Sequence, residues 1–135
     1  MDERILIVSD DQRNAATRES LAQNGFSVTL GDDEQNGYRH LLESRFDLVI
    51  VNLSDAARGL GLIKQIRANS VLGKLLILAV ADWGTGQLTM ALSAGADGLE
   101  PAPIDPERLI ASVTRMLRPN LTKTARASVT EQATE

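Results

Sequence analysis

Short apolar runs alternate along the chain with longer segments in which apolar residues recur at helical spacing. Most of the runs are rich in Val, Ile and Leu. Near-continuous apolar runs of this kind are typical of parallel β-strands that are covered on both faces, because a strand with one solvated face would alternate with polar residues. Strands are therefore predicted at Arg4–Val8, Ser27–Leu30, Phe46–Leu53, Leu75–Ala81 and Ala96–Leu99.

The first two segments between the strands carry helix signals. A helix is expected at about Gln12–Asn24, because the cluster Ser9–Asp11 before it is rich in capping residues. In the next segment Tyr38, Leu41 and Leu42 form the expected inner face of a second helix. The chain therefore begins with the order strand, helix, strand, helix.

Two further helices are predicted after loops. Leu60, Ile63 and Ile66 recur at helical spacing after a loop at Ser54–Arg58. The next helix is expected to open at Gly84–Gly86, where the chain reads Gly-Thr-Gly. Its residues at i, i+3, i+4 and i+7, which share one face, are Leu88, Ala91, Leu92 and Gly95.

Prolines divide the end of the chain. They exclude helix until Asp105 and Pro106, which suit the cap and the first position of a final helix. Pro119 ends that helix, and the residues after it are rich in Thr, Ala, Ser and charge and lack a core-facing pattern. We expect one domain at residues 1–118 and a flexible tail, or the start of a linker, at residues 119–135.

The alternation of strands and helices predicts the fold class. Short βα connections are right-handed and return to the same sheet, which gives an α/β fold with a doubly wound, five-stranded parallel sheet and helices on both faces. By analogy with flavodoxin-like folds, the expected strand order is 2-1-3-4-5.

Composition narrows the functional classes. The net charge of -4 and the pI near 5.0 argue against a nucleic-acid surface. The absence of cysteine excludes disulfides and thiolate metal sites. No apolar run approaches the ~18 residues of a membrane span, and the first residues lack the features of a signal peptide. We therefore expect a cytoplasmic protein that contacts neither membrane nor nucleic acid.

Asn52 is the polar residue near the end of the predicted third strand. In an open α/β sheet, side chains at the carboxyl ends of the strands face the ligand crevice, so Asn52 is expected where chemistry would occur. An amide oxygen is uncharged and is a poor nucleophile. The sequence therefore predicts a crevice whose central residue cannot act as a carboxylate.

Four segments of the chain together resemble the receiver domain of two-component response regulators, over about Glu3 to Leu117. They read Arg-Ile-Leu-Ile-Val-Ser-Asp-Asp at residues 4–11, Phe-Asp-Leu-Val-Ile-Val-Asn-Leu at 46–53, Ala-Gly-Ala-Asp-Gly at 94–98 and Ala-Pro-Ile-Asp-Pro-Glu-Arg-Leu at 102–109. Such receivers use paired acids after strand 1 to hold Mg²⁺ and a phosphoacceptor Asp at the end of strand 3. They also carry a Thr or Ser at the end of strand 4 and a Lys before a cis-Pro after strand 5.

The resemblance implies a degenerate site, because most of these positions are changed. Ser9 stands in place of the first acid, and Asn52 stands in place of the phosphoacceptor. Ala81 replaces the hydroxyl residue, and Ala102 replaces the Lys. A shift of one residue would replace Ala81 by Val80, which also lacks a hydroxyl. A similar strand-3 run occurs in the degenerate second receiver of PleD-type diguanylate cyclases, in which two receivers precede a GGDEF domain.

Asp10 keeps the place of the second acid and is a weak candidate metal ligand beside Asp11. Asp55 and Asp82 could join them, but a hard cation needs convergent oxygens and only Asp10 is placed by the motif. We therefore expect these acids to form a solvated rim and expect no cofactor, Mg²⁺ included; the alternative is that they attract a divalent ion.

Candidate interaction residues lie on the face that helix 4, strand 5 and helix 5 form, the usual dimer surface of such receivers. Leu99 stands where active receivers often carry an aromatic residue, which implies that this output face is fixed. Arg108 and Arg115 are candidates for its charged rim or, in the alternative, ordinary solvated residues. Trp83 could anchor a partner or pack on its own loop.

The favoured function is that of a receiver that cannot be phosphorylated, has no enzymatic activity and works as an interaction or dimerisation module. Its partner would be another receiver or an output domain, in cis or in trans, or a second copy. One alternative is a phosphorelay receiver that uses Asp10, Asp11 or Asp55 as a displaced acceptor. Another is a small-molecule binding domain that uses the crevice and the turn at Gly84–Gly86.

Overall fold

Five parallel strands form the centre of the protein, which we describe from a computed structural model at residues 3–9, 14–53, 56–82 and 86–118. The strand order is β2-β1-β3-β4-β5, so the predicted fold class and order are confirmed. The strands are β1 (Arg4–Val8), β2 (Ser27–Gly31), β3 (Leu48–Asn52), β4 (Leu76–Ala81) and β5 (Gly98–Pro101).

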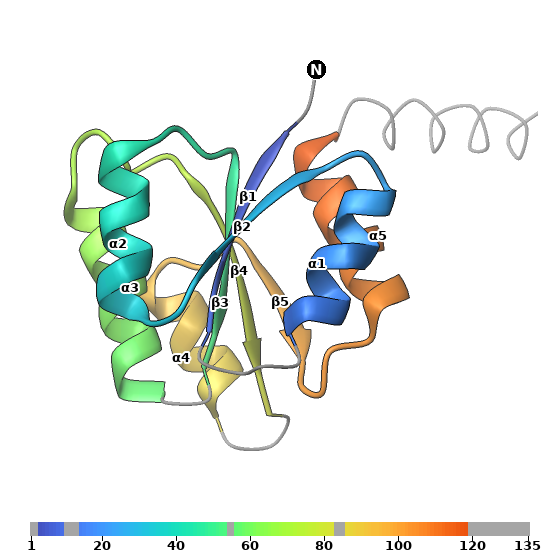
Figure 1. Cartoon of the computed structure of the whole chain (residues 1–135). Helices are drawn as coiled ribbons and strands as arrows, with labels where there is room; N and C mark the ends of the chain where they lie inside the picture. The colour runs from blue at the N-terminus through green and yellow to red at the C-terminus, as the bar shows by residue number, and fades with distance from the viewer. Residues whose placement is uncertain (1–2, 10–13, 54–55, 83–85, 119–135) are drawn as a thin grey trace, which may run out of the picture.

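Helices cover both faces of this sheet. Figure 1 shows α2, α3 and α4 on one face and α1 and α5 on the other. None of the helices in the described part of the chain has the length and apolar character that crossing a bilayer requires. The helices are α1 (Asn14–Gln23), α2 (Glu34–Glu43), α3 (Ala56–Ala68), α4 (Gln87–Ala94) and α5 (Pro106–Leu117).

Alternating side chains on the strands divide the core into two clusters. Val49 and Val51 of β3 lie in the first core cluster, which includes Leu41, Ile63 and Ala91 from α2, α3 and α4. Leu48 and Ile50 of β3 lie in the second core cluster, together with residues of α1 and α5: Leu21, Leu109 and Val113. Both faces of β3 are therefore buried, as its continuous apolar run predicts.

The inner face of α2 differs from the prediction. Leu42 is 58% exposed, whereas Gly37 and Leu41 are buried. The reason lies at Gly37, where a Cβ would be 2.5 Å from Cγ2 of Val8, so the missing side chain allows close approach of α2 to β1. This approach turns the Gly37 and Leu41 side of α2 inward and leaves Leu42 outside.

Several element boundaries also differ from the predictions, such as those of β3, which spans Leu48–Asn52 instead of Phe46–Leu53. Helix α3 begins at Ala56, inside the predicted loop at Ser54–Arg58. Strand β5 begins at Gly98 instead of Ala96, because the backbone N–H of Ala96 donates to the carbonyl of Ala91 (2.9 Å) and thereby still belongs to the end of α4. Leu92, placed by the pattern on the same face as buried Ala91, is 53% exposed.

Arg67, near the end of α3, connects four segments at the amino edge of the sheet, the edge where the strands begin. Its Nε donates to the carbonyl of Gly95 (2.9 Å), and Nη1 donates to those of Gly73 (2.9 Å) and Leu75 (2.6 Å). Its Nη2 donates to Oδ2 of Asp97 (2.6 Å), which also accepts from the backbone N–H of Ile77 (2.9 Å). One guanidinium therefore holds the ends of α3 and α4 against the starts of β4 and β5.

The first and last described residues are also joined at the amino edge. Nε and Nη2 of Arg118 donate to the two carboxylate oxygens of Glu3 at 2.7 and 2.9 Å, and the guanidinium lies 4.8 Å from the centre of the Phe26 ring. The hydrogen bonds from Arg118 lower the pKa of the Glu3 carboxyl below its ordinary value, against the opposing effect of partial burial. This contact fixes the position of α5 relative to β1 and the start of β2.

We expect Arg67→Lys to lower the free energy of unfolding by about 1.5–3 kcal/mol, because an ammonium cannot reproduce the planar fork that reaches Gly95, Leu75 and Asp97 together. Urea denaturation measures the change. The control is Arg58→Lys on the same helix, since Arg58 is 65% exposed and its Nε lies 4.0 Å from Oε2 of Glu34. Equal losses in the two variants would contradict the role of Arg67.

We expect Glu3→Gln to destabilise the protein at neutral pH and to lose this effect in acid. A carboxyl whose pKa is depressed by folding stabilises the native state above its unfolded pKa, and this contribution disappears as the pH falls through the folded pKa. Urea denaturation over a pH series compares the two proteins. The control repeats Glu3→Gln in a protein that already carries Arg118→Gln, where the substitution should cause no pH-dependent loss of stability. If the same loss still appeared there, it would come from another group and not from the contact between Glu3 and Arg118.

Candidate functional site

Four of the predicted site residues lie at the carboxyl edge of the sheet, where the strands end. Val8 pairs with Val51, which makes Ser9 and Asn52 the next positions on adjacent strands. Asn52 pairs with Val80, the residue before Ala81. The backbone N–H of Ala102 donates to the carbonyl of Ala81 (2.9 Å). The β-ladder thus brings together the four positions that the resemblance selects.

These residues differ in their accessibility. Ser9 and Ala81 are buried, and Asn52 and Ala102 are half-buried. The side chain of Ala81 belongs to the first core cluster, and that of Ala102 packs against the second. The peptide bond between Ala102 and Pro103 is cis. At this edge the half-buried amide of Asn52 follows four buried residues of β3.

Several predicted site residues lie outside the described part of the chain. They are Asp10, Asp11, Asp55, Trp83, Gly84 and Thr85. The metal-ligand, displaced-acceptor, partner-anchor and small-molecule hypotheses that rest on them stay predictions. Asp82 is described, directly follows β4 and is exposed.

The described groups at the carboxyl edge limit its chemistry. The side chains of Ser9 and Asn52 offer a hydroxyl and an amide, and those of Ala81 and Ala102 offer only methyl groups. Among the described residues no group of three or more His, Asp or Glu side chains is placed to hold a metal ion. The acids proposed as Mg²⁺ ligands, Asp10, Asp11 and Asp55, lie outside the described residues, so the expectation that no Mg²⁺ binds stays a prediction.

The predicted interaction residues that the structure describes lie on β5 and α5 in different environments. Leu99 is half-buried and packs against the first core cluster, whereas Arg108 is exposed. Arg115 donates from Nη2 to Oγ of Ser112 (3.3 Å), and that hydroxyl donates to Oε1 of Glu100 on β5. Arg115 is thus the outer member of a polar chain that connects α5 with β5.

Sequence reasoning missed the inner members of this chain. Ser112 is 3% exposed and lies beside Val113 on the buried side of α5. A hydroxyl at an inward helical position needs a hydrogen-bond partner, which is the signal that could have indicated Glu100. On α4, Met90 and Leu92 are also exposed apolar side chains, with exposed fractions of 52% and 53%.

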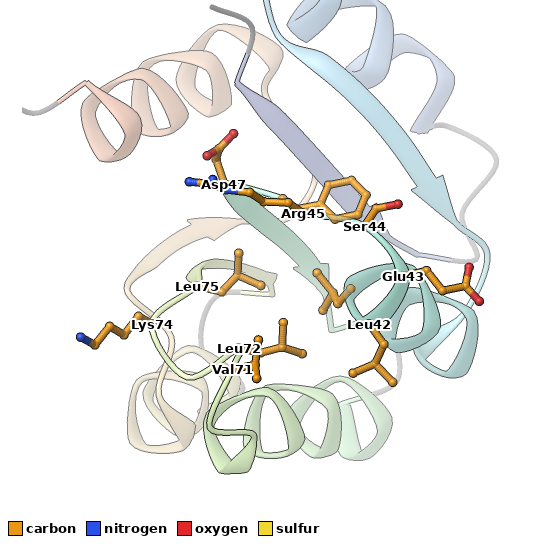
Figure 2. Close-up of a pocket in the computed structure, with 11 residues that line it drawn as sticks. Leu42, Glu43, Ser44, Arg45, Asp47, Val71, Leu72, Lys74 and Leu75 are labelled. Carbon is orange, nitrogen blue, oxygen red and sulfur yellow. The ribbon is translucent and has the colours of Figure 1, made fainter.

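A hollow of about 670 Å³ lies at the opposite, amino edge of the sheet, as Figure 2 shows. Residues 41–47 form one side of it, and Val71, Leu72, Lys74 and Leu75 form the other. The side chains around it carry both signs of charge, with Glu43 and Asp47 beside Arg45 and Lys74. None of the predicted site residues lies in this hollow, so it is separate from the carboxyl-edge site.

Comparisons with known proteins agree with this geometry. A family model described as the response regulator receiver domain matches residues 5–114. The protein PetR of Rhodobacter capsulatus is 32% identical over 116 residues, which are 84% of this chain and 48% of that protein. The response regulator ArlR of Staphylococcus saprophyticus is 32% identical over 117 residues, 85% of this chain and 52% of that protein. The chain thus spans about half the length of the curated relatives it matches.

Solved structures match at lower identity and support the fold alone. The chemotaxis response regulator CheY4 of Vibrio cholerae is 22% identical with a TM-score of 0.80, covering 87% of this chain and 100% of that one. A CheY-like receiver domain protein of Methanospirillum hungatei is 21% identical with a TM-score of 0.79, covering 91% of this chain and 99% of that one.

Proposed function

The chain belongs to the response regulator receiver family, and we propose that its phosphorylation site is inactive and that it acts through contacts with other proteins. The observation that carries the proposal is Asn52 at the carboxyl end of β3. Its amide stands at the position of the phosphoacceptor and lacks the charge and the nucleophilic oxygen of a carboxylate.

The residues around Asn52 support the same proposal. Phosphoryl transfer depends on positive groups that neutralise the charge on the phosphoryl oxygens. Ala102 provides no cation at the position of the Lys, and Ala81 provides no hydroxyl at the position that would respond to phosphate. Together with Ser9 in place of the first acid, the four changes act on different parts of one reaction, so they are consistent with the loss of the reaction as a whole.

We further propose that α4, β5 and α5 form the surface that binds the partner. Met90 and Leu92 of α4 expose apolar side chains, and Arg108 and Arg115 of α5 provide exposed charge. The partner would be another receiver, an output domain or a second copy of this domain. The run Asp47–Asn52 favours a role like that of the second receiver of PleD-type diguanylate cyclases. In this role the domain catalyses no reaction and needs no Mg²⁺.

We expect the wild-type protein to gain no phosphoryl group from acetyl phosphate with Mg²⁺, measured by intact mass. Asn52→Asp alone should also fail, because the new carboxylate lacks a Lys at position 102. Without Mg²⁺ this variant should be modestly less stable near neutral pH, because the resemblance implies that the new carboxylate lies beside Asp10 and like charges repel. Ser9→Asp, Asn52→Asp and Ala102→Lys together should permit slow phosphorylation.

The triple variant is the positive control, because it restores a metal-binding acid, the nucleophile and the counter-charge. Even after phosphorylation, amide exchange in α4 and α5 should stay unchanged, since Ala81 and Leu99 lack the hydroxyl and the aromatic ring. Phosphorylation of the wild type would overturn the proposal, and mapping of the modified residue would then test the alternative acceptors Asp10, Asp11 and Asp55.

We expect the domain to associate with itself, or with a receiver or output domain encoded beside it, without any phosphodonor. Met90→Lys combined with Leu92→Lys should weaken this association at least tenfold by replacing two exposed apolar side chains of α4 with charges, measured by analytical ultracentrifugation. The matched control is Val71→Lys, because Val71 is 88% exposed and lies at the amino edge. A strict monomer that binds no such neighbour would exclude the interaction module.

A further inference from the structure

The tetrapeptide Gln-Asn-Gly-aromatic occurs twice in the chain, at residues 23–26 and at residues 35–38. An asparagine followed by glycine is prone to deamidation, because no side chain on the glycine hinders attack by its backbone nitrogen. The two copies have nearly the same local sequence and thus nearly the same intrinsic reactivity. Any difference between them in the folded protein must come from the structure.

The first copy lies in an exposed turn between α1 and β2. Asn24 and Gly25 are both exposed, and Gly25 has φ of +90° with no atom within 4 Å of the place where a Cβ would lie. The side-chain amide of Asn24 donates to the carbonyl of Ser20 (2.8 Å), and the N–H of Gly25 donates to that of Ala22 (3.1 Å). Both bonds belong to the last turn of a helix, which frays at little cost.

The second copy is held inside α2. The N–H of Asn36 donates to the capping carboxylate of Asp33 (2.8 Å), and the N–H of Gly37 donates to the carbonyl of Asp33 (2.8 Å). Gly37 is buried against Val8, so the backbone there cannot turn without separating α2 from β1. Attack by Gly37 nitrogen on the side chain of Asn36 therefore requires local unfolding.

We propose that Asn24 is a site of spontaneous deamidation in the folded protein and that Asn36 is protected. The backbone nitrogen of Gly25 loses its proton and bonds to Cγ of Asn24, and Nδ2 leaves as ammonia. Water then opens the resulting succinimide ring at either carbonyl, which gives aspartate or isoaspartate. The only co-reactant is water, and base accelerates the step because it removes the proton from the backbone nitrogen.

The products change a turn that joins two buried side chains. Leu21 and Phe26 lie in the second core cluster on either side of this turn, and the N–H of Phe26 donates to the carbonyl of Leu21 (3.2 Å). Isoaspartate adds a methylene to the backbone between them. Either product places a negative charge at the carboxyl end of α1, which the helix dipole disfavours. Deamidation therefore loosens α1 and β2 and leaves the carboxyl-edge site untouched.

The test incubates the full chain at mildly alkaline pH and maps peptides by mass spectrometry, with isoaspartate identified by fragmentation. In the native protein we expect Asn24 to react at least ~10-fold faster than Asn36, since each factor of ten needs only about 1.4 kcal/mol of additional opening free energy. In urea the two asparagines should react at comparable rates. Similar native rates, or a native Asn24 that reacts no faster than Asn36, would overturn the proposal.

Two variants identify the reacting asparagine from the ammonia released, without relying on the recovery of peptides. Asn24→Gln should remove most of the ammonia that the native protein releases, because glutamine would have to close a larger ring. Asn36→Gln should leave the release unchanged. The opposite pattern would assign the reaction to α2 and refute the protection argument. Thermal melting of the incubated protein should shift downward with the extent of reaction at Asn24.

Discussion

Burial of the central strands on both faces is the constraint on which the rest of the structure depends. Residues 48–51 of β3 are all buried, so neither face of this strand can carry a polar side chain toward water. Helices must therefore cover both faces, and each connection must return the chain to the amino edge before the next strand begins. Polar groups of these strands can then emerge only at their ends, which makes the carboxyl edge the place for chemistry.

The same constraint creates a need for hydrogen-bond donors at the amino edge of the sheet. Carbonyls of connections that pass close to the core need hydrogen-bond donors, because unpaired polar groups are costly when they leave water. Arg67 supplies such donors to Gly73, Leu75 and Gly95. A guanidinium suits this role because its N–H groups point in several fixed directions from one plane. Contacts at the amino edge thus stabilise the fold. Residues at the carboxyl edge can therefore change, and a reaction there can be gained or lost, without loss of these contacts.

Sequence reasoning identified most of the fold because local patterns determine it. Continuous apolar runs identified the strands, and Asp105 with Pro106 marked the start of α5, where Oδ1 of Asp105 accepts from the N–H of Glu107 (3.1 Å). It failed at Leu42, because the orientation of α2 depends on the approach of Gly37 to Val8, a contact between distant residues. Arg67, whose partners are up to 30 residues away, was missed for the same reason. At the site, the strand positions were enough to predict that Ser9, Asn52, Ala81 and Ala102 lie at one edge. The contact between Ser112 and Glu100 could not be predicted, because it depends on how α5 packs against β5.

The two Gln-Asn-Gly tetrapeptides show why a local motif has no fixed structural meaning. In the first copy the glycine adopts a positive φ, which residues with a Cβ rarely adopt, and the chain turns there from α1 into β2. In the second copy the glycine is helical and serves close packing, because a Cβ would collide with Val8. Glycine satisfies both demands for different physical reasons, backbone freedom in one case and small volume in the other. The capping carboxylate of Asp33 before the second copy provides the local difference, since it fixes the start of α2 ahead of Asn36.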